Sequence, residues 1–142
     1  MKASHLHDVW SSPDNSRLTS KQFSFRLPTH IAAKIAALCE MYPTKNRTQI
    51  VADLLTSSLD ELERNLPEGL GLLVENQHDF ERVAEHLGEE YEPVYYLGGA
   101  KGRFHELANQ HYADLEKELG NEEAGELFAP RHICASELKA KD

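Results

Sequence analysis

The stretch 21-KQFSFRLPTHIAAKIAALCEMYPTKNRTQIVADLL-55 decides the fold of the first half of this chain. Apolar and polar side chains alternate over its first seven residues, so that they fall on opposite faces of an extended backbone. This period of two is typical of a half-buried strand, and Pro28, which cannot donate to a strand ladder, ends it. The sequence therefore predicts one short strand. Its apolar face holds Phe23, Phe25 and Leu27, and its polar face holds Gln22, Ser24 and Arg26.

Two amphipathic helices are predicted after this strand. The first begins near Pro28, since proline is tolerated in a first turn, and Pro43 ends it. Asn46 is a favoured N-cap residue for the second helix, which we expect to run from Arg47 to about Asn65. Apolar residues at helical spacing, together with the apolar strand face, form the predicted core. Its members are Phe23, Phe25, Leu27, Ile31, Ile35, Leu38, Ile50, Val51, Leu54 and Leu55.

The predicted strand has no partner strand nearby in the sequence. Unpaired backbone N–H and C=O groups are costly where they are buried, and the apolar face also needs a cover. A second copy of the chain meets both needs if two strands pair antiparallel across a two-fold axis. We therefore expect a homodimer whose core contains the apolar residues above, with the polar strand face on the outside of the ribbon.

Residues 21–66 resemble a ribbon-helix-helix DNA-binding domain of the Arc/MetJ/CopG type. The resemblance lies in the strand QFSFRLP, the first helix THIAAKIAALCE and the start of the second helix, NRTQIVADLL, and it covers about a third of the chain. It implies a mainly α fold with a short β-ribbon, an intertwined dimer, and a ribbon that enters the major groove of DNA. The turn Met41–Thr44 departs from the family, because it lacks the usual glycine and is longer.

The resemblance also implies which residues contact DNA. A two-stranded ribbon fits the major groove, where arginine is the usual partner of guanine and glutamine of adenine. A helix N-terminus offers unpaired N–H groups and a positive dipole end to a phosphate, and nearby lysines add positive charge. The expected base contacts are Gln22, Ser24 and Arg26, and the expected phosphate contacts are Lys21, Lys45, Asn46, Arg47 and Thr48.

The charge of the chain is uneven. The net charge is −9, yet residues 1–66 carry 8 Lys and Arg against 7 Asp and Glu, and residues 67–142 carry 7 against 17. Such asymmetry suggests two different surfaces. We expect a flexible N-terminal arm over 1–20, the DNA-binding and dimerisation domain over 21–66, and an acidic, α-rich region over 67–142. Within that region we expect strands at 70–74 and 94–97, helices at 80–87, 104–119 and 121–128, and frayed residues after Pro130.

The sequence predicts a transcriptional regulator, with repression by steric occlusion of the DNA. No nucleophile–base–acid set is recognisable, and the eight histidines show no known ligand spacing, so we expect neither an enzyme nor a metal or other cofactor. The sequence shows no membrane-spanning run, no signal-peptide core and only two cysteines, from which we expect a cytoplasmic protein. The expected partners are double-stranded DNA and a second copy of the chain.

Two alternatives stay open. In the first, the chain is an antitoxin of a toxin–antitoxin pair, and residues 67–142 bind the toxin protein. In the second, residues 67–142 form the effector domain of a ligand- or metal-responsive regulator. Both alternatives keep DNA binding in residues 21–66 and differ from the first interpretation in the role of the acidic region.

Overall fold

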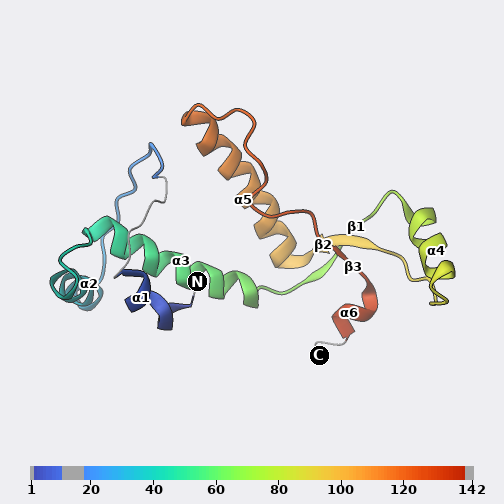
Figure 1. Ribbon diagram of the computed structural model, residues 1–142, viewed down its shortest axis with the longest axis horizontal. Coiled ribbons are helices and arrows are strands. Elements are labelled where there is room, and N and C mark those ends of the chain that lie inside the picture. The colour runs from blue at the N-terminus through green and yellow to red at the C-terminus, as the bar shows by residue number, and fades with distance from the viewer. Residues whose placement is uncertain (1, 11–17, 140–142) are drawn as a thin grey trace. The chain divides into compact units, whose positions relative to one another are not determined.

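The protein is mainly helical, with 56% of its residues in helices and a small three-stranded antiparallel sheet (Figure 1). The computed structural model describes residues 2–10 and 18–139. The chain divides into two compact units, Met1–Asn65 (unit 1) and Leu66–Asp142 (unit 2). The predicted mainly α class is therefore confirmed.

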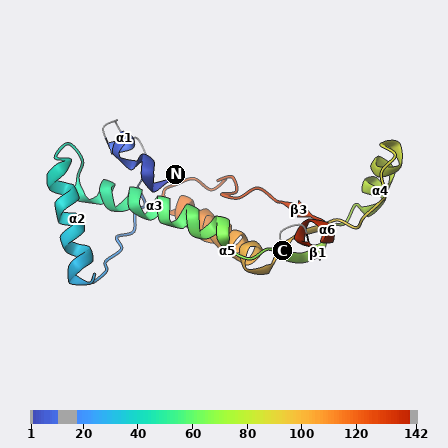
Figure 2. The same ribbon diagram turned by 90° about the horizontal axis from the view of Figure 1, so that it is seen from below.

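Unit 1 is built on a hairpin of two helices, α2 (Thr29–Met41) and α3 (Arg47–Asn65). Figure 2 shows that the two helices cross at a steep angle, with the turn before Arg47 between them. Pro43 lies in that turn, where it prevents α2 from continuing, and α3 begins directly after Asn46. Both helices thus have the bounds that their proline and N-cap residues predict.

The N-terminal residues differ from the flexible arm expected over 1–20. A short 3₁₀ helix, η1 (Ala3–His5), leads into α1 (Leu6–Trp10), while residues 11–17 lie outside the described part of the chain. Leu6 and Trp10 are each only 4% exposed, because they pack on the fully buried Ile50 of α3. Leu6 and Trp10 are spaced by one helical turn, so both side chains can face α3. Leu6 and Trp10 are therefore part of the core of unit 1.

Unit 2 is an antiparallel sheet of order β1 (Gly69–Leu73), β2 (Tyr95–Gly98) and β3 (His132–Ile133), and α5 (Gly99–Glu118) packs against β1 and β2. Its buried hydrophobic side chains, among the described residues, are Val74, Val94 and Ile133. A helix predicted over 121–128 is absent. Residues 131–139, within the segment expected to be frayed, instead add a third strand and a helix, while residues 140–142 lie outside the described part of the chain. The other elements of unit 2 are α4 (Gln77–His86) and α6 (Ala135–Lys139).

Glycines allow the close approach of β1, β2 and α5. Gly99 has a φ of +69°, a conformation that side chains disfavour, and it makes the sharp change from β2 into α5. At Gly102, in the first turn of α5, a Cβ atom would clash with the backbone oxygen of Leu97. The glycine-rich stretch 97–102 is therefore explained by backbone packing.

The side chain of Gln77 joins the two segments that enclose α4. Its Nε2 donates to the backbone oxygens of Val74 and Val94, each at 2.7 Å. Its Oε1 accepts from the backbone N–H of Val94 at 3.0 Å and from the hydroxyl of Tyr91 at 2.6 Å. The amide thus uses both of its donors and its acceptor oxygen. It fixes Val74, which follows β1, beside Val94, which precedes β2.

Candidate nucleic-acid interface

The N-terminus of α3 is capped by a reciprocal pair of hydrogen bonds. Asn46 Oδ1 accepts from the backbone N–H of Gln49 at 2.8 Å, and Gln49 Oε1 accepts from the backbone N–H of Asn46 at 3.1 Å. The predicted N-cap at Asn46 is thereby confirmed. The contribution of Gln49 was missed, although the spacing N-x-x-Q is the sequence signal for such a capping box.

The expected phosphate contacts lie together around this cap. Asn46, Arg47 and Thr48 are exposed, Lys45 directly before them is half-buried, and the first turn of α3 contains no acidic residue. The first N–H groups of a helix have no acceptor within the helix, and its dipole is positive at this end. The arrangement can therefore accept an anionic oxygen. Lys21, the fifth expected phosphate contact, lies in the segment before α2, where its N–H donates to Thr19 Oγ1 at 3.2 Å.

The expected base contacts lie on a segment that forms no strand in the single chain. Gln22, Ser24 and Arg26 are all exposed, and residues 22–28 have no regular secondary structure. The physical reason is that a strand requires a hydrogen-bonded neighbour, and none of the described residues of this chain supplies one. Phe23 and Phe25 are 63% and 76% exposed, so the apolar face of the segment also lacks a cover.

The residues expected to form a dimer core divide into two groups. Ile50 is fully buried within one chain by α1, and Leu38 and Leu54 pack partly against the same cluster, so the burial of these three needs no second copy. The expectation that all ten residues belong to the core of a dimer stays a prediction. Ile31, Ile35 and Val51 are half-buried, whereas Leu55 and the strand residues Phe23, Phe25 and Leu27 are about half or more exposed.

Helix α3 presents two different faces. Ile50, Asp53 and Ser57, spaced by three and four residues, are buried on the face that α1 covers. Leu55, Leu59 and Leu62 recur at the same helical spacing but are each at least 50% exposed. Their positions in a 3.6-residue turn place them on another side of the helix. Unit 1 therefore keeps an apolar helix face exposed in addition to the strand segment.

Helix α1 contacts both α3 and the turn that precedes it. The indole Nε1 of Trp10 donates to Asp53 Oδ2 at 2.6 Å, and both residues are buried. The Trp10 and Tyr42 rings meet edge to face at 5.1 Å between centroids, and His7 Nδ1 lies 2.6 Å from the Tyr42 hydroxyl. The turn Met41–Thr44 is thus supported by aromatic contacts from α1 to Tyr42.

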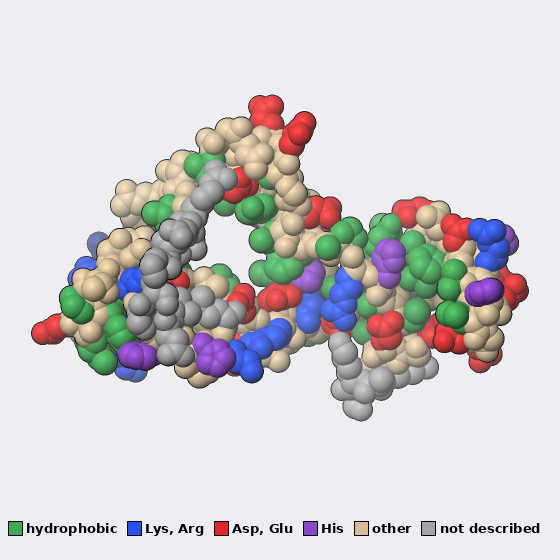
Figure 3. Space-filling view, viewed as in Figure 1, with side chains coloured by type: hydrophobic (Ala, Val, Ile, Leu, Met, Phe, Trp, Pro, Cys, Tyr) green, Lys and Arg blue, Asp and Glu red, His purple; other side chains and the backbone are tan. Residues whose placement is uncertain are grey.

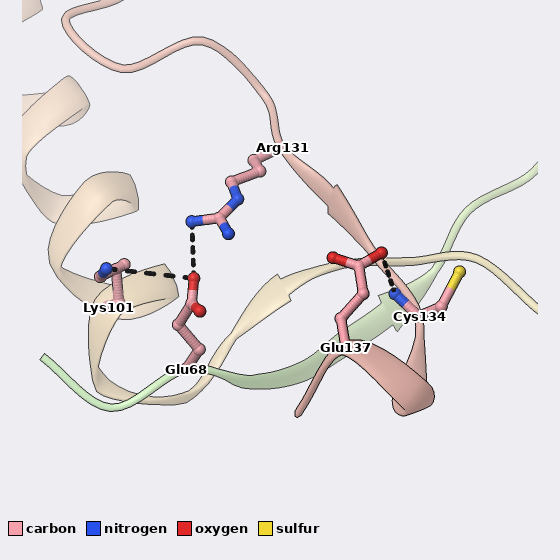
Figure 4. Close-up of polar contacts among 5 residues, drawn as sticks. All are labelled: Glu68, Lys101, Arg131, Cys134 and Glu137. Atoms are coloured by element: carbon pink, nitrogen blue, oxygen red, sulfur yellow. Dashed lines mark hydrogen bonds and ion pairs between the residues drawn. The ribbon is translucent and has the colours of Figure 1, made fainter. Parts of the chain in front are cut away.

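A buried carboxylate pairs with two basic residues of unit 2, Lys101 and Arg131 (Figure 4). Glu68 Oε2 lies 2.5 Å from Arg131 Nη1 and 3.9 Å from Lys101 Nζ, and Glu68 and Lys101 side chains are almost fully buried. A buried charge needs such partners to offset its lost hydration. Both cations are therefore held by Glu68 in a structural ion-pair cluster.

Cys134 and Glu137 form a contact separate from the Glu68 cluster. The backbone N–H of Cys134 donates to Glu137 Oε1 at 3.2 Å (Figure 4). Burial raises the pKa of the Cys134 thiol, and the nearby carboxylates of Glu92 and Glu137 raise this pKa further. The thiolate, which is the reactive form, is therefore disfavoured at this position.

A cavity of about 270 Å³ lies between β2, α5 and residues 126–131. The ring of His105 stacks on that of Phe128, with centroids 4.0 Å apart and planes 5° from parallel. Asn109 holds the cavity wall in place, since its side chain accepts from the N–H of Phe128 at 2.8 Å and donates to its carbonyl oxygen at 3.0 Å. The cavity is thus bounded by a fixed loop.

Among residues 2–10 and 18–139, no group of three His, Cys, Asp or Glu side chains could hold a metal ion. None of the helices in the described part is long and apolar enough to cross a membrane. Comparison of the chain with protein-family models, with curated proteins and with solved structures finds no match in any of the three.

Proposed function

We propose that this chain is a sequence-specific DNA-binding regulator, acting as a repressor, that reads the major groove with a two-stranded ribbon formed by two copies. Residues 21–27 of each copy form the ribbon, and Gln22, Ser24 and Arg26 contact the bases. The N-terminus of α3 binds phosphate through Asn46, Arg47 and Thr48, with Lys21 and Lys45 adding positive charge. No catalytic step and no cofactor is part of this proposal.

One observation carries the proposal. An exposed segment with alternating Phe23, Phe25 and Leu27 directly precedes a two-helix hairpin whose second helix has a capped, cationic N-terminus. Aromatic side chains exposed by 63% and 76% are unfavourable in water, and their burial would contribute about 25 cal/mol per Å² of apolar surface removed. Pairing with the same segment of a second copy would satisfy the backbone as well as the side chains.

The exposed face of α3 supports the same assembly. Leu55 lies at the start of this face and is 51% exposed, and Leu59 and Leu62 extend it along the helix. A monomer rarely keeps a contiguous apolar patch of this kind in water. In a dimer, this face and the strand segment would become one continuous interface, while the face of α3 that binds α1 would remain within each chain.

DNA selection tests the proposal directly. The purified full chain is incubated with fragmented genomic DNA, and the retained fragments are sequenced, which should yield a palindromic motif because the dimer is two-fold symmetric. Arg26→Ala should relax the preference at one base step in each half-site. Arg64→Ala is the matched control, since it removes the same charge from an exposed residue at the other end of α3. Retention of random fragments by the wild-type chain would contradict sequence-specific binding.

A further inference from the structure

Strand β1 is an open edge of the sheet in unit 2. Within the described part of the chain it pairs only with β2, through Gly69 with Gly98, Leu70 with Leu97 and Leu73 with Tyr95. The other side of β1 has no neighbouring strand there. An edge strand presents a row of N–H and C=O groups to which another extended chain can bind.

Two of the features that usually protect an exposed edge, charged residues and proline, are missing from β1, while its register with β2 shifts between Leu70 and Leu73. Its sequence, Gly69–Leu73, reads GLGLL and contains no charged residue and no proline. Leu72 is 81% exposed and Leu73 is 52% exposed. Proteins commonly blunt an edge with lysine, proline or a covering loop, because an exposed apolar edge otherwise pairs with other chains. The composition of β1 therefore favours addition of a strand.

Acidic residues follow this apolar edge directly. Residues 75–92, which include α4 and connect β1 to β2, contain seven Asp and Glu against a single basic residue, Arg82. Arg82 is itself paired with Asp79 at 2.8 Å. In the right-hand part of Figure 3, where α4 and β1 lie, apolar side chains are bordered by acidic ones.

We propose that β1 is a docking edge for an extended segment of another protein, apolar in its centre and basic at its flanks. The segment would add to β1 as a fourth strand, so that main-chain hydrogen bonds provide affinity and Leu72 and Leu73 provide apolar contact. Its basic flanks would face the carboxylates of residues 75–92. A second copy of this chain fits less well, because each copy brings the same excess of negative charge to the contact.

Peptide binding to the full chain tests this proposal without reference to DNA. The probe is a fluorescent peptide of alternating threonine and valine with two lysines at each end, and the control peptide carries glutamates instead of the lysines. Fluorescence anisotropy measures affinity across a salt series, and amide NMR shifts report where the peptide binds. We expect the lysine peptide to bind at least about tenfold more tightly than the glutamate peptide, with the advantage falling as salt screens the charges.

Two matched variants locate the contact. Leu72→Lys places a positive charge on a highly exposed position of β1, where it would repel a basic peptide. We expect this variant to lower the affinity for the lysine peptide at least about tenfold. Leu127→Lys adds the same charge at another exposed leucine, outside β1, and should change affinity about twofold or less. Far-UV circular dichroism confirms that both variants are folded, and the largest amide shifts should lie within residues 69–73.

Three results would overturn the proposal. One is failure of the lysine peptide to bind at millimolar concentration, and another is equal affinity for the two peptides. The third is self-association: if Leu72→Lys, but not Leu127→Lys, lowers the mass of the assembly in sedimentation, the edge belongs to a second copy of this chain. Since none of these measurements involves DNA, they leave the proposed DNA-binding function to be judged separately.

Discussion

Replacing Trp10 by phenylalanine removes the indole N–H and keeps an aromatic ring against Ile50. In the wild-type chain Nε1 of Trp10 donates to Asp53 Oδ2 at 2.6 Å, with Trp10 4% and Asp53 8% exposed. A hydrogen bond to a charged group contributes about 1.5–3 kcal/mol, and a buried acceptor that loses its donor suffers a similar penalty. We therefore expect Trp10→Phe to lower the free energy of unfolding by about 2–3 kcal/mol, against about 3–5 kcal/mol for Trp10→Ala, which also removes the ring.

Urea denaturation followed by far-UV circular dichroism measures this loss. All variants are compared at one protein concentration, because association of copies would shift the apparent stability. A double-mutant cycle with Asp53→Ala isolates the pair, and the coupling should lie within about 0.5–3 kcal/mol. Trp10 is the only tryptophan, so its emission reports the docking of α1 independently, and we expect the blue-shifted spectrum of a buried indole.

The reasoning would be refuted by a Trp10→Phe effect within about 0.5 kcal/mol, the range of ordinary surface substitutions. A cycle without coupling, or wild-type emission typical of an indole in water, would lead to the same conclusion. The first two results would show that the hydrogen bond between Trp10 and Asp53 contributes nothing to stability. Emission typical of an indole in water would show that α1 is not packed on α3, which would leave Ile50 available to a second copy.

Three further predictions concern DNA binding and pH. Arg26→Ala should cost about 1–3 kcal/mol of binding to the selected DNA in gel-shift assays, and unchanged affinity would show that the strand is not the reader. Arg47→Ala should weaken binding to all sequences evenly and make the salt dependence shallower, whereas a base-specific loss would contradict a phosphate contact. A backbone hydrogen bond and then the Tyr96 hydroxyl, 2.8 Å away, lower the pKa of Glu75 from its ordinary 4.5. The stabilisation from Glu75 is therefore fully present above that value and is lost as pH falls through the lower native pKa. Tyr96→Phe should reduce this acid sensitivity in urea titrations, and an unaltered acid profile would show that the contact is not made.

The helices of this chain could be predicted because their signals are local. Pro43 follows the end of α2, and Asn46 directly precedes the start of α3. Within each helix, apolar residues recur at helical spacing. The existence of α4 and α5 and the positions of their C-terminal ends were confirmed for the same reason, with Gly88 and Gly120, both at positive φ, following those ends. Their starts were predicted too late, because α4 begins at Gln77 and α5 at Gly99 rather than at 80 and 104. The strands β1 and β2 were also expected, as short apolar runs beside glycines.

The missed elements depend on contacts between distant residues. β3 contains only His132 and Ile133 and exists because they pair with β2, which lies more than thirty residues earlier. Two residues are too few for an alternating pattern to be visible. The segment 121–128 does not form its predicted helix, and its Phe128 backbone is instead bound by the side chain of Asn109. For the candidate interface, the sequence identified the cap at Asn46 but could not show that α1 covers Ile50.

The central claim is that residues 21–27 of two copies form one ribbon, and sedimentation equilibrium with one matched pair of variants tests it most directly. Phe25→Asp places a negative charge on the apolar face of the segment, and Ser24→Asp places the same charge on its polar face. Both positions are exposed in the single chain. We expect the wild type and Ser24→Asp at about 32 kDa or a multiple, twice the 16.1 kDa of one chain, and Phe25→Asp at 16.1 kDa. A folded wild-type monomer at micromolar concentration, or a dimer that Phe25→Asp leaves intact, would contradict the ribbon.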